Sequence, residues 1–164
     1  MHCDSETSAL KQLRQLAAQY PTANHLAFAW RIRDQQGVIT ERFFDAGEPS
    51  GTAGRPILAP LQGEALINTL VAVVRYFGGI KLGTGGLTRA YGHSAKLAIE
   101  AAGKLPWVEM VQHKLTIDYS QLQLLEYQLK QIHGRIIAQQ FTDQVTLVVE
   151  LPASELAGLQ QQFS

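Results

Sequence analysis

The chain has 164 residues, a length that fits one medium domain or two small ones packed together. Its 14 lysines and arginines balance its 14 aspartates and glutamates, so any attraction to nucleic acid must come from local clusters of charge and not from the net charge. With 46% hydrophobic and 17% charged residues, and no apolar run near the roughly 20 residues that cross a bilayer, the composition excludes a disordered chain and a membrane-spanning one.

The first predicted elements are a helix and a hairpin. Apolar residues recur at helical spacing over residues 10–20, with Asp4 or Ser5 as the N-cap, which predicts an amphipathic helix. Residues 26–32 and 38–44 mix apolar, β-branched and aromatic types on either side of a glycine-containing turn. This pattern predicts a β-hairpin.

A loop and a buried strand are predicted next. The segment DAGEPSGTAGR at residues 45–55 is rich in turn-forming residues and predicts an ordered loop, with a short helix from Pro56. The continuous apolar run from Leu70 to Tyr76 predicts a strand buried on both faces, at the centre of the first domain. Five glycines follow this strand and lead into a helix that closes near Gly103.

Pro106 interrupts the helical pattern, so we place a domain junction near it, between a first domain of residues 1–108 and a second of residues 109–164. Ser120 and Gln123 predict a capping box for the first helix of the second domain. The elements expected there are a strand around residues 114–119, a helix ending at Gly134, strands at 135–141 and 145–151, and a last helix through Leu156, Leu159 and Phe163. The order βαββα predicts a ferredoxin-like unit that lacks its final strand.

The most informative segment for function lies between the buried strand and the following helix. No acidic residue occurs between Arg75 and Ile99, whereas Lys81, Arg89 and Lys96 do. Glycines at a strand-to-helix junction let backbone N–H groups approach an anion, which the helix N-terminus also favours. The candidate phosphate-binding residues are Arg55, Arg75, Gly78, Gly79, Lys81, Gly83, Thr84, Gly85, Gly86 and Arg89. The alternative is that the glycines serve only a tight turn and close helix packing.

Aromatic residues accompany these cations. Tyr76 and Tyr91, together with Phe77, are candidates for stacking on nucleic-acid bases. The alternative for each ring is ordinary core packing. The glycine spacing matches neither GxxxxGK[ST] nor GxGxxG, so the sequence does not support ATP hydrolysis or dinucleotide binding.

Other candidate chemistry is sparse. Asp45 and Glu48 are loop acids that could hold a cation or orient a water, or instead bond neighbouring backbone groups in turns. The five histidines have no metal-ligand spacing, so we expect no metal and no cofactor. Cys3 has no partner for an internal disulfide, and the chain does not open with a secretory signal, so we expect a cytoplasmic protein.

Two motifs, RYFGGIKLGTGGLTRAYG at residues 75–92 and DAGEPSGTAGRPIL at residues 45–58, closely resemble the signatures of the IMPACT family. This resemblance implies an α+β fold, with a first domain similar to the second domain of a ribosomal small-subunit protein and a ferredoxin-like second domain. It also implies a role in the regulation of translation, because eukaryotic relatives restrain a kinase that acts on an initiation factor. The basic strand with which members usually begin is not found before Asp4, so we expect a trimmed or shortened end.

We therefore expect a protein that binds RNA or a ribosome-associated surface, with no membrane partner and without catalysis as its main role. One alternative is an enzyme in which the glycine segment holds a phosphorylated small molecule. Another is a regulator that binds an acidic protein partner.

Overall fold

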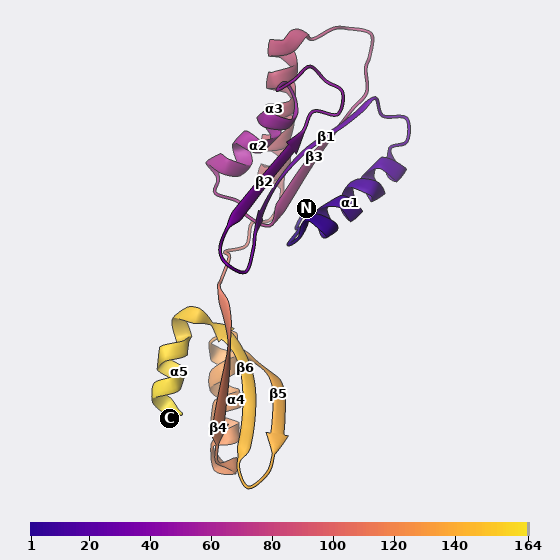
Figure 1. Ribbon diagram of the computed structural model, residues 1–164. Coiled ribbons are helices and arrows are strands. Elements are labelled where there is room, and N and C mark those ends of the chain that lie inside the picture. The colour runs from indigo at the N-terminus through magenta and orange to yellow at the C-terminus, as the bar shows by residue number, and fades with distance from the viewer. Residues whose placement is uncertain (164) are drawn as a thin grey trace. The chain divides into compact units, whose positions relative to one another are not determined.

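The computed structural model describes residues 1–163, and the chain divides into two compact units, Met1–Lys104 and Leu105–Ser164. The sequence-based junction after residue 108 lies close to this division. Each unit combines helices with a small antiparallel sheet (Figure 1), which confirms the predicted α+β fold. No helix in residues 1–163 is long and apolar enough to cross a membrane.

The first unit is a three-stranded antiparallel sheet in the order β2-β1-β3, with helices on both of its faces (Figure 1). Its strands are β1 (His25–Arg33), β2 (Ile39–Phe44) and β3 (Thr69–Arg75). Its helices are α1 (Glu6–Gln19) on one face, and α2 (Gly54–Gly63) and α3 (Gly83–Ala101) on the other. The predicted hairpin is confirmed as β1 and β2, and the side chain of Ser5 caps α1 by accepting the N–H of Ser8.

Alternate residues of β1 enter two separate cores. Ala27 and Ala29 pack against α2 and α3, whereas Trp30 and Ile32 pack with residues of α1. The small alanines let the two helices approach the sheet closely. This face positions α3, whose N-terminal end carries the glycine segment.

The position predicted for β3 is wrong in one respect. Leu70 and Val71 are buried on opposite faces, as expected, but the strand lies at the edge of the sheet and β1 is central. The continuous apolar run arises because helices cover both faces, and that pattern does not distinguish a covered edge strand from a central one. At its outer edge β3 pairs briefly with the start of the chain, where His2 bridges to Thr69 and Cys3 is buried.

The second unit has the predicted order βαββα and a three-stranded sheet in the order β4-β6-β5. Its elements are β4 (Met110–Ile117), α4 (Leu122–Gln131), β5 (Arg135–Phe141), β6 (Val145–Pro152) and α5 (Leu156–Gln162), with short 3-10 turns before α4 and α5. The capping box is formed by Asp118 and Gln121 rather than by Ser120 and Gln123, because a 3-10 turn precedes α4 and moves the cap toward the N-terminus.

Candidate functional site

The loop between β2 and α2, residues 45–53, is organised by the carboxylate of Asp45. One oxygen accepts the N–H of Gly51 at 2.9 Å, and the other accepts the N–H groups of Ala53 at 3.0 Å and Gly54 at 2.7 Å. Although burial alone would raise the pKa of Asp45, these backbone hydrogen bonds and the nearby Arg55 hold it below its ordinary value. Asp45 therefore closes the loop and caps the start of α2.

The fold tolerates no side chain at Gly54, at the end of this loop. A Cβ at this position would lie 2.7 Å from the backbone nitrogen of Phe44, which is closer than real Cβ contacts allow. The motif around it is thus required for the close approach of α2 to β2.

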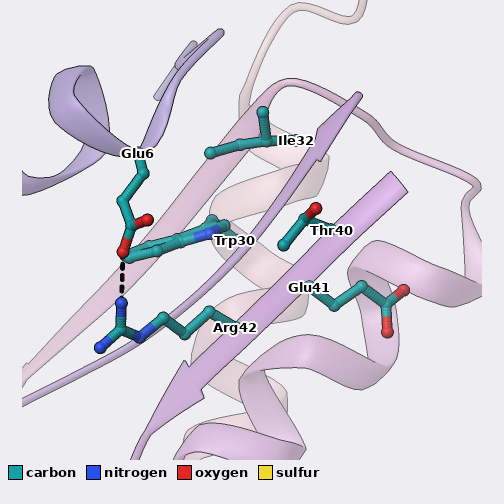
Figure 2. A pocket seen from close by; sticks show the side chains of 6 residues that line it. All are labelled: Glu6, Trp30, Ile32, Thr40, Glu41 and Arg42. Carbon is teal, nitrogen blue, oxygen red and sulfur yellow. Dashed lines mark hydrogen bonds and ion pairs between the residues drawn. The ribbon is translucent and has the colours of Figure 1, made fainter. Parts of the chain in front are cut away.

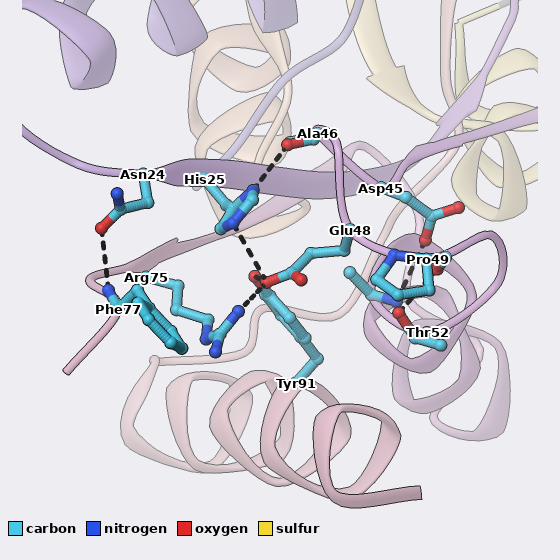
Figure 3. A network of polar contacts seen from close by, with 11 residues as sticks. Asn24, His25, Asp45, Ala46, Glu48, Pro49, Thr52, Arg75, Phe77 and Tyr91 are labelled. Atoms are coloured by element: carbon cyan, nitrogen blue, oxygen red, sulfur yellow. Dashed lines mark hydrogen bonds and ion pairs between the residues drawn. The ribbon is translucent and has the colours of Figure 1, made fainter. Parts of the chain in front are cut away.

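Glu48 is the second loop acid, and its side chain is only 4% exposed. Its Oε1 accepts a hydrogen bond from the hydroxyl of Tyr91 at 2.8 Å and forms an ion pair with Arg75, while Nε2 of His25 lies 3.7 Å away (Figure 3). Burial acts to raise the pKa of Glu48, but the hydrogen bonds from Tyr91 and Arg75 outweigh it and lower that pKa. The carboxylate stays ionised.

We call Glu48, Arg75, Tyr91 and His25 the Glu48 junction. They come from the loop after β2, the end of β3, the middle of α3 and the start of β1, so the junction ties four segments together (Figure 3). His25 is held in turn, because its Nδ1 lies 2.8 Å from the carbonyl oxygen of Ala46. Sequence reasoning missed His25, since a single histidine at the start of a strand carries no signal of its partners.

Two residues predicted for ligand contact lie inside this junction. Tyr91 is 2% exposed, so its ring is unavailable for stacking, and burial beside Glu48 raises the pKa of its hydroxyl and keeps it a donor. Arg75 is largely covered and is neutralised by Glu48. The alternative of core packing therefore describes Tyr91, and Arg75 already has Glu48 as its counter-ion.

The segment between β3 and α3, residues 76–82, is here called the glycine loop. It is anchored at its start, where the N–H of Phe77 donates to the side-chain oxygen of Asn24 at 2.8 Å (Figure 3). The segment is exposed on both sides of this anchor, with Tyr76 53% and Ile80 78% accessible to solvent. The structure thus presents the glycine loop at the surface of the first unit.

Glycine at two positions of this region is not required by the fold. Gly79 and Gly83 have φ angles of +90° and +70°, where glycine is favoured. Gly78 has an ordinary φ and would have no neighbour within 4 Å of an added Cβ, and Gly85 would meet only the end of the Arg89 side chain at 3.5 Å. Gly78 and Gly85 leave bare backbone where a side chain would fit.

The N-terminus of α3 continues this surface. The helix begins at Gly83 and receives no side-chain cap from its N-cap residue Leu82, and within residues 1–163 no side chain accepts from the N–H groups of Thr84 and Gly86. Lys81 and Arg89 are exposed and form no ion pair within residues 1–163. An uncapped helix N-terminus with two unpaired cations attracts anions.

The remaining predicted cation lies elsewhere. Arg55 belongs to the first turn of α2, and its guanidinium lies 5.4 Å over the ring of Phe43. Among the described residues, no hydrogen bond, ion pair or ring contact joins Arg55 to the glycine loop. Within residues 1–163, no group of three or more His, Cys, Asp or Glu side chains is arranged to hold a metal ion.

A shallow hollow of about 290 Å³ lies on the α1 side of the sheet (Figure 2). Trp30 and Ile32 line it, and the ion pair of Glu6 with Arg42 lies beside it, with the guanidinium 5.4 Å over the Trp30 ring. None of the predicted site residues lines this hollow. It is separate from the glycine loop.

Comparisons with known proteins match most of the chain. Residues 1–99 match the family profile described as the Impact N-terminal domain, and residues 115–164 match a domain of unknown function (DUF1949). The chain is 36% identical over 156 residues to the IMPACT family member YigZ of Escherichia coli (strain K12), covering 95% of this chain and 76% of that protein.

Other relatives agree with this match. Identity is 36% to an IMPACT family member of Thermus thermophilus, over 94% of this chain and 82% of that one, and 36% to YvyE of Bacillus subtilis (strain 168), over 77% and 58%. A solved structure described as a crystal structure of a hypothetical protein is similar with a TM-score of 0.70 and 35% identity, covering 98% of this chain and 78% of that chain. The chain belongs to the IMPACT family, as its two motifs predicted.

Proposed function

We propose that the first unit binds the phosphate backbone of RNA, free or on a ribosome-associated surface, through the glycine loop and the N-terminus of α3. The observation that carries this proposal is the bare backbone at Gly78 and Gly85 beside two unpaired cations, Lys81 and Arg89. Neither packing nor backbone conformation explains the missing side chains at these two glycines.

The chemistry of the surface favours phosphate over other groups. Uncapped N–H groups at a helix start point at an incoming anion, and the helix dipole adds a partial positive charge there. Lys81 and Arg89 supply full charges, and no acidic residue occurs between Arg75 and Ile99 to oppose them. A polyanion that runs along this surface would satisfy all of these donors.

We place this binding in the regulation of translation. The IMPACT signature motifs, at residues 45–58 and 75–92, are the segments that build the loop and helix end described above. The resemblance of the first domain to a ribosomal protein domain supports RNA as the polyanion.

The salt dependence of binding tests the proposal. The affinity for a labelled single-stranded RNA is measured from about 50 to 200 mM salt for the native chain, Lys81→Ala and Arg89→Ala. Because each cation releases counterions from a phosphate, each variant should lower the affinity and reduce the slope of log K against log[salt] by about 0.7.

Lys11→Ala is the matched control, since Lys11 is an exposed cation on α1, across the sheet from α3. It should leave both the affinity and the slope unchanged. Binding that does not depend on salt, or an equal loss in the Lys11 variant, would contradict a site at the glycine loop.

A further inference from the structure

The glycine loop exposes aromatic side chains directly before its bare backbone. Tyr76 is 53% exposed and Phe77 is 47% exposed, although they follow a strand whose residues are partly or fully buried. Ile80 and Leu82 are exposed in the same loop. Single exposed apolar residues are ordinary, whereas four exposed apolar side chains within one seven-residue loop are a candidate binding surface.

Phe77 is held in place by two contacts, one to its backbone and one to its ring. Its N–H is anchored on Asn24, and the guanidinium of Arg75 lies 5.7 Å over its ring. Arg75 is itself held by the buried carboxylate of Glu48. The Glu48 junction therefore holds Arg75 beside the ring of Phe77, which remains 47% exposed.

We propose that this site selects unpaired RNA over duplex RNA, because bases stack on Tyr76 and Phe77 while the adjoining phosphates meet the N-terminus of α3. This inference rests on the proposed function and adds the class of RNA. In a duplex the base faces are already stacked on one another, so an aromatic platform gains contact only with unpaired bases. Stacking accepts any base, so little sequence preference is expected.

The test compares one RNA strand of roughly 12 nucleotides with the same strand annealed to its complement. The variants Tyr76→Leu and Phe77→Leu remove the aromatic face and keep an apolar side chain. Each should lower the affinity for the single strand by about tenfold and leave the affinity for the duplex unchanged. The salt slope should stay as in the native chain, because no phosphate contact is lost.

Tyr127→Leu is the matched control, since Tyr127 is a tyrosine of the second unit that is 60% exposed. It should leave both affinities unchanged. Far-ultraviolet circular dichroism and the unfolding midpoint of each variant show that it is folded.

The outcomes separate the two proposals. Equal affinity of the native chain for both forms of the RNA, or an equal loss for both in the variants, overturns the selection of unpaired RNA while leaving phosphate binding in place. Failure of the native chain to bind either form at low salt overturns the proposed function and this inference together.

Discussion

The charged side chains around the glycine loop divide between those that bond to the protein itself and those that stay open to solvent. The carboxylates of Asp45 and Glu48 accept hydrogen bonds from the protein itself, and Arg75 forms an ion pair with Glu48. Lys81 and Arg89 remain exposed. The position of a charged residue beside the glycine loop is therefore not enough to assign it as a ligand contact.

Breaking the Glu48 junction should destabilise the first unit strongly. Glu48→Gln leaves Arg75 without a counter-ion in a partly buried site, which costs about 3–5 kcal/mol for a buried pair. Glu6→Gln breaks the exposed ion pair with Arg42 and should cost less than about 1 kcal/mol. Urea unfolding followed by the NMR signal of the buried Trp30 indole measures both, and equal effects would show that the junction contributes no more than a surface pair.

The stability of the first unit should also depend on pH. The pKa values of Asp45 and Glu48 lie below their ordinary values of 3.8 and 4.5 in the folded protein. A lowered folded pKa means that each group contributes stability above its unfolded pKa and loses that contribution as the pH falls through the folded value.

We therefore expect the free energy of unfolding of the first unit to fall as the pH drops below about 4.5. Asp45→Asn should remove its share of that slope, because asparagine does not titrate. The measurement is urea unfolding at a series of pH values between neutral and acid. An unchanged slope in Asp45→Asn would show that other carboxylates cause the acid destabilisation.

Among the elements, α3 begins with a first turn that is rich in glycine. These glycines expose its backbone but lower the stability of the helix. Gly85 lies in the first turn, where alanine would fit without a clash and would favour the helix by up to about 1 kcal/mol. Gly85→Ala should therefore raise the stability of the first unit. If this backbone binds phosphate as proposed, Gly85→Ala should also weaken RNA binding, because the added methyl group covers it.

Gly158→Ala is a matched control in α5, where an added Cβ also meets nothing within 4 Å. It should raise the stability of the second unit and leave the RNA affinity unchanged. Thermal unfolding and RNA titration of both variants give the comparison. Unchanged RNA affinity in Gly85→Ala would show that this glycine does not lie under the ligand.

At the scale of the whole molecule, the chain is two small α+β units, each with its own apolar core. The first unit carries the glycine loop, the Glu48 junction and the residues proposed to meet RNA. In the second unit, helices cover one face of a three-stranded sheet, and on the other face alternate residues of β4 are exposed and those of β6 are half-buried. The two units match two different family profiles.

The order of the elements, the hairpin, the strand–glycine loop–helix arrangement and the family could all be predicted from the sequence. These follow from hydrophobic periodicity, turn residues and two motifs, all of which depend on residues close together in the chain. Two contacts could be seen only in the folded protein: Arg75 pairs with Glu48, 27 residues away, and Tyr91 donates to the same carboxylate from 43 residues away. Which side chains are buried partners and which remain open to a ligand depends on how the helices and strands pack, and local patterns do not contain that information.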